Sequence, residues 1–114
     1  MKRYIATENP ATEAICFHMQ QCAEKYLKIF LIYHGHEHPR THDIAHIVKK
    51  CAEIDKSFDE LKKRGVGILS KYAVGVRYDE EIFPSIEETE KAIQLAEEVR
   101  AFVLEKLKEK EFEL

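Results

Sequence analysis

The sequence lacks the marks of a secreted, disulfide-bonded or membrane-spanning protein. It has three cysteines with none of the CxxC spacing of redox or zinc sites, and such an odd, scattered set indicates free thiols in a reducing compartment. No apolar segment follows the amino terminus, so no signal peptide is predicted. The longest apolar run, 26–33, is interrupted by Lys28 and is too short to cross a bilayer. We therefore expect a cytoplasmic protein without a membrane span.

A general basic excess is also missing. Residues 1–78 contain 13 Lys and Arg against 9 Asp and Glu, a net charge of +4. Residues 79–114 contain 5 against 12, a net charge of −7. A field that would attract nucleic acid to the whole surface is therefore excluded. A polyanion would have to bind the first two-thirds of the chain.

The alternation of apolar and polar residues that is typical of β-strands is absent, and helical spacing is found instead. Asn9-Pro10 predicts the start of a first helix that runs to about His34, with Gly35 as the residue after its end. Thr41 predicts the N-cap of a second helix, with Asp43 in its first turn.

The remaining chain predicts shorter elements and one long helix. Asp55 or Ser57 can cap a segment that continues through Phe58, and a third helix is expected over 67–77. A capping box, Ser85 with Glu88, opens the last helix. The chain of 114 residues therefore predicts one all-α domain over 1–114, an antiparallel up-and-down bundle of four to five helices.

The first helix is predicted to be the centre of this bundle. Its main apolar face is expected to comprise Ile15, Met19, Cys22, Tyr26, Ile29, Phe30 and Tyr33. Further apolar residues, Leu27, Leu31 and Ile32, exceed what one bundle face can cover. We therefore expect a second subunit to cover them in a homodimer.

Histidines are concentrated in one region and raise the question of a metal site. They are His34, His36, His38, His42 and His46, of which His42 and His46 are expected to share a helical face. Zinc binds such side chains, but the loop is loosely organised and the HExxH pattern is absent. We expect no native metal or other cofactor, and at most adventitious metal binding by His34, His36 and His38.

Two further sets of polar residues could bind or cleave a phosphodiester. Arg40 and His46 could serve in metal-independent RNA cleavage, with imidazole as acid or base and guanidinium on the phosphate. A polar stripe of His18, Gln21, Lys25 and Lys28 could meet Arg40, His42 and Arg77 around a phosphate. The plain alternative is that Lys25 pairs with an acid such as Asp43.

Three motifs in register resemble the HEPN (higher eukaryotes and prokaryotes nucleotide-binding) domain family. They are CFHMQQCAEKYLKIFL (16–31), PRTHDI (39–44) and YAVGVRY (72–78). The resemblance covers residues 14–104, and in the first motif the matching residues are Gln20, Gln21, Glu24, Lys25 and Lys28.

The resemblance implies a helical bundle that commonly forms homodimers and takes nucleotide or RNA as ligand. It also implies association with a minimal nucleotidyltransferase, as in toxin–antitoxin pairs. Ribonucleases of the family carry an R-x4-6-H motif, and Arg40 and His46 meet its length although they lie in the second motif.

Three hypotheses follow and remain open. The first is a binding module for a nucleotide, RNA or a nucleotidyltransferase, acting through Lys25, Arg40, His42, Arg77 and Tyr78, with Tyr78 stacking on a base. The second is an endoribonuclease that uses Arg40 and His46. The third is a purely structural interaction module whose polar motif residues, such as Gln21, Glu24, Thr41 and Asp43, only fix the fold.

Overall fold

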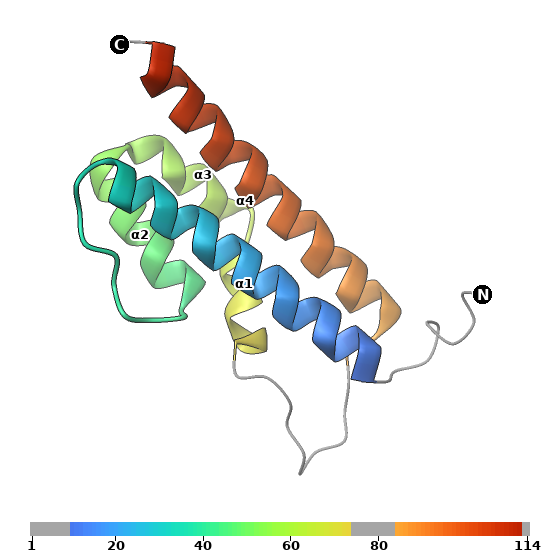
Figure 1. Cartoon of the computed structure of the whole chain (residues 1–114). Helices are drawn as coiled ribbons and strands as arrows, with labels where there is room; N and C mark the ends of the chain where they lie inside the picture. The colour runs from blue at the N-terminus through green and yellow to red at the C-terminus, as the bar shows by residue number, and fades with distance from the viewer. Residues whose placement is uncertain (1–9, 74–83, 113–114) are drawn as a thin grey trace.

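The computed structural model describes residues 10–73 and 84–112, and every regular element in these ranges is a helix (Figure 1). The α-helices are α1 (Pro10–Tyr33), α2 (Ile44–Ile54), α3 (Asp59–Lys63) and α4 (Ile86–Phe112). Two 3₁₀ helices, η2 (Lys56–Phe58) and η3 (Val66–Tyr72), lie between them. The predicted all-α bundle is confirmed. None of the described helices is both long and apolar enough to span a bilayer.

α1 ends where the sequence predicts. Gly35 has φ +80°, a left-handed conformation that costs glycine little. The Gly35 amide donates to the carbonyl of Ile32 (2.9 Å), and the His36 amide donates to that of Leu31 (3.0 Å). These two bonds form a Schellman motif, which satisfies carbonyl groups left open by the last turn.

α2 begins later than predicted, and its N-cap is Asp43 rather than Thr41. The Asp43 carboxylate accepts from the Ala45 amide at 3.0 Å. The Thr41 hydroxyl accepts from the Asp43 amide at 3.1 Å, so it stabilises the turn before the helix. Ser70 of η3 fixes this start, because its hydroxyl accepts from the Ile44 amide (2.8 Å) and donates to Asp43 Oδ1 (3.2 Å).

The predicted caps of the later elements are confirmed for Asp55 and for the capping box. Asp55 accepts from the Ser57 amide at 3.0 Å and caps η2. The Glu88 amide donates to Ser85 Oγ at 3.0 Å, and the Ser85 amide donates to Glu88 Oε1 at 3.4 Å. In place of the predicted third helix over 67–77, η3 covers Val66–Tyr72, and the end of that prediction lies outside the described residues.

The direction of the helices differs from the predicted up-and-down order. α1 and α4 start at the same end of the bundle and run parallel (Figure 1). At this end the Cys16 thiol donates to Thr89 Oγ1 at 3.6 Å, and at the other end His34 and Lys106 line one pocket. The chain from η2 to η3 runs back along α4, where Phe58 lies beside Phe102 and Tyr72 beside Glu88. This return permits two long helices to point the same way.

The buried face of α1 is rotated from the predicted one. Of the predicted face, Ile29 and Tyr33 are exposed, and only Phe30 is fully buried. The core contribution of α1 comes instead from Cys16, Ala23, Leu27, Phe30 and Leu31. The expectation that Leu27 and Leu31 need a second subunit is therefore wrong, since both are covered within one chain. Ile32 is exposed as expected.

Candidate functional site

Glu24 is the centre of a polar network between α1 and the segment before α2. Its side chain is almost buried, with the residue 6% exposed. Oε1 accepts from Gln20 Nε2 (3.0 Å) and Oε2 from Lys28 Nζ (2.8 Å). The imidazole Nδ1 of His42 lies 3.0 and 3.1 Å from the two carboxylate oxygens. The QQxxEK part of the first motif thus contacts the histidine of the second motif.

Gln20 completes the connection between the two segments. The residue is fully buried, and its Nε2 donates both to Glu24 Oε1 and to the backbone carbonyl of His42 (2.9 Å). Its Oε1 accepts from Gln21 Nε2 at 2.7 Å. Because an unpaired buried amide would cost about 1–3 kcal/mol, this arrangement strongly favours the observed path of the chain at His42.

The network keeps Glu24 ionised. Burial by itself would raise the pKa of this carboxyl, but the hydrogen bonds from Lys28, His42 and Gln20 together hold the pKa below its ordinary value. A fixed negative charge therefore lies against Nδ1 of His42. A carboxylate in this position requires that Nδ1 carry a proton.

His42 itself faces solvent. Its side chain is 66% exposed although Nδ1 is held by the buried carboxylate. The other ring nitrogen, Nε2, has no hydrogen-bond partner within residues 10–73 and 84–112. One side of the imidazole is therefore anchored to α1, and the other is available to a ligand.

The remaining predicted binding residues have different surroundings. Lys25 and Arg40 are exposed, and neither forms an ion pair with a described side chain. The predicted pairing of Lys25 with Asp43 is absent, since Asp43 instead caps α2. Arg77 and Tyr78, the other two predicted binding residues, lie outside the described residues.

His46 lies in a separate environment. It lines a cavity of about 700 Å³ bounded by α2, α3 and the start of η3, with Lys49 and Lys62 among the lining residues. Arg40 is not among those residues. The prediction that His42 and His46 share a helical face is wrong, because α2 begins at Ile44 and His42 precedes it.

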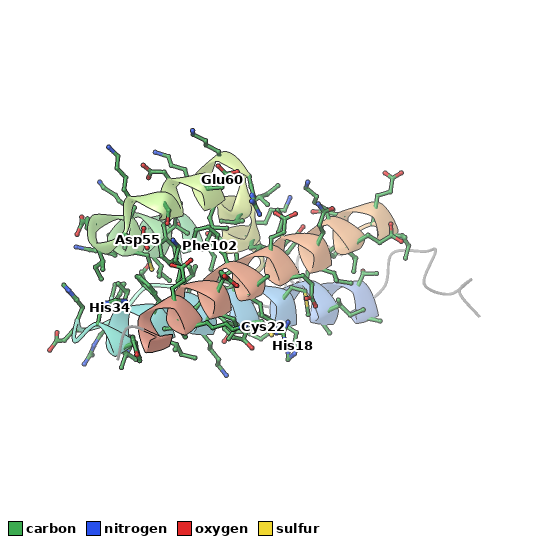
Figure 2. All side chains as sticks on the ribbon, turned by 90° about the horizontal axis from the view of Figure 1, so that it is seen from above. His18, Cys22, His34, Asp55, Glu60 and Phe102 are labelled. Atoms are coloured by element: carbon green, nitrogen blue, oxygen red, sulfur yellow. The ribbon has the colours of Figure 1, made fainter. Side chains whose placement is uncertain are left out.

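The other histidines do not gather around a common point. In the described part of the chain no three His, Cys, Asp or Glu side chains are placed to hold a metal ion. His34 packs on Phe30, with ring centroids 4.4 Å apart, and Figure 2 shows it at the same end of the bundle as Asp55. His36 and His38 are exposed on the connector.

Sequence reasoning placed Glu24 and Gln20 in a motif but missed what they contact. The only local signal was Glu24 with Lys28 at the i, i+4 spacing of a helical ion pair. The contact with His42 spans 18 positions and depends on the path of the loop, which sequence spacing does not give.

Comparison with protein families supports the motif resemblance. The family model described as HEPN domain matches residues 4–107. No curated protein and no solved structure matches this chain. The matched range includes the Glu24–His42 contact, all of α1 and most of α4. The chain therefore belongs to the HEPN domain family.

Proposed function

We propose that this HEPN domain binds the phosphates of a nucleotide or RNA through Lys25, Arg40 and His42. The observation that supports this is the anchored, outward-facing imidazole of His42, with an exposed basic residue on each of the two joined segments that pairs with no described side chain. Exposed cations that form no internal ion pair are available to an anionic ligand. Arg77 and Tyr78 belong to the proposal as a further phosphate contact and a stacking surface.

In this proposal the polar motif residues have a structural role. Glu24 fixes the loop against α1, Gln21 supports the neighbouring Gln20, and Thr41 and Asp43 order the start of α2. They hold the basic side chains in place without contacting the ligand.

Titration with ATP and with a short RNA tests the proposal. The double variant Lys25→Met, Arg40→Met is expected to weaken binding at least about tenfold, because each charge-assisted hydrogen bond contributes about 1.5–3 kcal/mol. Lys91→Met, which removes one exposed lysine from α4, is the control and is expected to bind as the wild type does. Absence of saturable binding to both ligands would overturn the proposal.

We also propose that the domain forms a homodimer, through a face different from the predicted one. Ile29 and Tyr33 of α1 are 46% and 45% exposed, and Ile93 and Leu104 of α4 are 38% and 40% exposed. Ile93 and Leu104 lie about three turns apart on the side of α4 opposite Phe102, which contacts Phe58.

These side chains form an apolar face over the parallel pair α1 and α4. Figure 2 shows Cys22 of α1 on the side away from α2 and α3. A second copy fits such a face, since a two-fold axis places the same apolar residues on both sides. Light scattering at micromolar concentration should give a dimer mass for the wild type and a monomer mass for Ile29→Asp. Ile68→Asp, in an exposed residue beside the α2–α3 cavity, is the control. A monomeric wild type would contradict the dimer.

Association with a minimal nucleotidyltransferase is the partner proposal that accompanies family membership. It is tested by co-purification with the nucleotidyltransferase encoded beside this chain, if one is found. If the domain bound that enzyme with full affinity but bound neither ATP nor RNA, its role would be protein interaction only.

The endoribonuclease alternative has less support from the geometry. Arg40 lies on the connector and His46 on α2, where His46 faces a cavity that Arg40 does not line. If purified protein cleaved RNA in EDTA and lost this activity with His46→Ala, the alternative would replace the binding module.

A further inference from the structure

The bond between Glu24 and His42 has a chemical consequence for the proposed phosphate site. A neutral imidazole has one N–H and one bare nitrogen. The ionised carboxylate of Glu24 lies at Nδ1, 3.0 Å away, and therefore favours the form in which Nδ1 carries the proton. In that neutral form the exposed Nε2 presents a lone pair to the solvent.

A lone pair on Nε2 cannot bind a phosphate oxygen, because both atoms are hydrogen-bond acceptors. Uptake of a second proton changes this. The imidazolium donates from Nδ1 to Glu24 and from Nε2 to the outside. Glu24 therefore couples the protonation of His42 to its ability to bind an anion.

The charged groups around His42 support this reading. Glu24 and Lys28 face it from α1, and Lys28 shares the carboxylate through Oε2 at 2.8 Å. Arg40 and Asp43 flank it on its own segment. From η3 the uncharged Ser70 binds the flanking Asp43. The buried acid is thus the group that fixes the ring, while the basic groups around it favour an anionic ligand.

We propose that Glu24 is a positioning residue that makes phosphate binding at His42 proton-linked, so that this HEPN domain binds phosphodiesters more tightly at acidic than at alkaline pH. The inference rests on the proposed function, because it requires the phosphate to lie at Nε2. It assigns to Glu24 a role beyond the structural one. It also assigns the phosphate contact to His42 rather than to His46.

A binding experiment with an RNA lacking terminal phosphates tests the inference. A 5′-hydroxyl oligouridylate keeps a constant charge between about pH 5.5 and pH 8, whereas histidines exchange a proton in this range. Wild-type affinity is expected to fall about tenfold over the range, which is the order of one charge-assisted hydrogen bond. His42→Gln should remove this extra loss. His38→Gln, an exposed histidine of the connector, should retain it.

A second measurement needs no ligand. Nitrogen NMR of the imidazole at about pH 8 is expected to show His42 protonated at Nδ1, the less common neutral form of free histidine. Glu24→Gln removes the charge at similar volume and should abolish this preference and reduce the pH dependence of RNA binding. Lys28→Met, which removes the ammonium group that binds the same carboxylate, should retain the preference.

The outcomes separate the two proposals. No binding of RNA or ATP at any pH would overturn the proposed function together with the phosphate contact. If RNA bound with an affinity that does not change with pH, or if His42→Gln left the pH dependence of the affinity unchanged, this inference alone would be overturned. A His42 ring protonated at Nε2 in the neutral wild type would overturn the positioning role of Glu24.

Discussion

The Tyr72 hydroxyl donates a hydrogen bond to Glu88 Oε2 across 2.7 Å, which joins the end of η3 to the first turn of α4. Lys71 adds an ion pair to the same oxygen at 2.9 Å, and Ser85 caps the helix beside it. Burial and the bond to Glu88 raise the pKa of Tyr72 far above its ordinary value. The hydroxyl therefore remains a donor at any ordinary pH.

Tyr72→Phe is expected to destabilise the fold by about 1–3 kcal/mol, because a half-buried carboxylate loses its neutral donor. Urea unfolding followed by circular dichroism measures the change. Lys71→Met is the matched control and should cost less, about 0–1 kcal/mol, since it removes only an exposed ion pair. Equal costs for the two variants would contradict this account.

Phe58 joins two aromatic neighbours in the core, with ring centroids 4.4 Å from Phe30 and 4.9 Å from Phe102. Phe58→Ala is expected to lower the free energy of unfolding by about 3–5 kcal/mol through lost burial and the cavity left behind. Ile68→Ala, at a half-exposed side chain, should cost less than about 1 kcal/mol. Denaturant midpoints of both variants measure the difference.

Acid should destabilise the protein partly through Glu24. Burial alone would raise its pKa, but its hydrogen bonds from Lys28, His42 and Gln20 depress it overall. A carboxyl whose pKa is depressed by folding stabilises the fold at pH values above its ordinary pKa of 4.5. That contribution is lost as the pH falls through the lower pKa of the folded protein. Glu24→Gln should therefore show a smaller decline in unfolding free energy from pH 6 to about pH 3, and an equally steep decline would contradict the prediction.

The three cysteines should react at different rates with a thiol reagent. Burial raises the pKa of Cys51 to about 12, and its thiol donates to the Leu27 carbonyl. Burial also raises the pKa of Cys16. Because the thiolate is the reactive form, the partly exposed Cys22 is expected to be labelled first and the other two only on unfolding. Mass spectrometry of labelled peptides checks this, with Cys22→Ser as the control. Labelling of Cys51 in the folded protein would refute it.

The N-cap of α2 gives a test of the corrected helix start. Asp43→Ala is expected to cost about 0.5–2 kcal/mol, as the loss of an N-cap does. Thr41→Ala should cost less, because its hydroxyl bonds only to the turn before the helix. Thermal unfolding of both variants at the same pH gives the order, and a larger loss for Thr41→Ala would restore the original prediction.

Features that depend on neighbours in sequence were predictable. Gly35 after α1 and the Ser85–Glu88 box before α4 are confirmed, because each is satisfied by bonds within a few residues. The start of α2 was not predictable, since Thr41 and Asp43 are both good caps. Ser70, far along the chain, selects Asp43 by binding it and the Ile44 amide.

The buried face of α1 was mispredicted for a related reason. Hydrophobicity alone excludes Gln20 and Glu24 from a core, yet both are buried because each polar atom finds a partner. Their burial turns α1 so that Leu27 and Leu31 point inward and Ile29 points out. For the site, the motif residues were identified from sequence. The histidine that contacts the Glu24 carboxylate could not be identified in this way, because that contact depends on the path of the loop.

The parallel pairing of α1 with α4 also affects synthesis of the chain. Of the described helices, α1 leaves the ribosome before α4, which supplies most of its cover, because α1 packs chiefly against α4. Until α4 emerges, the side of α1 that packs against it, for example at Cys16, has no cover in the nascent chain. Holdase chaperones bind surfaces of this kind, so a truncated chain that ends before α4 should be captured by them while the full-length chain is released.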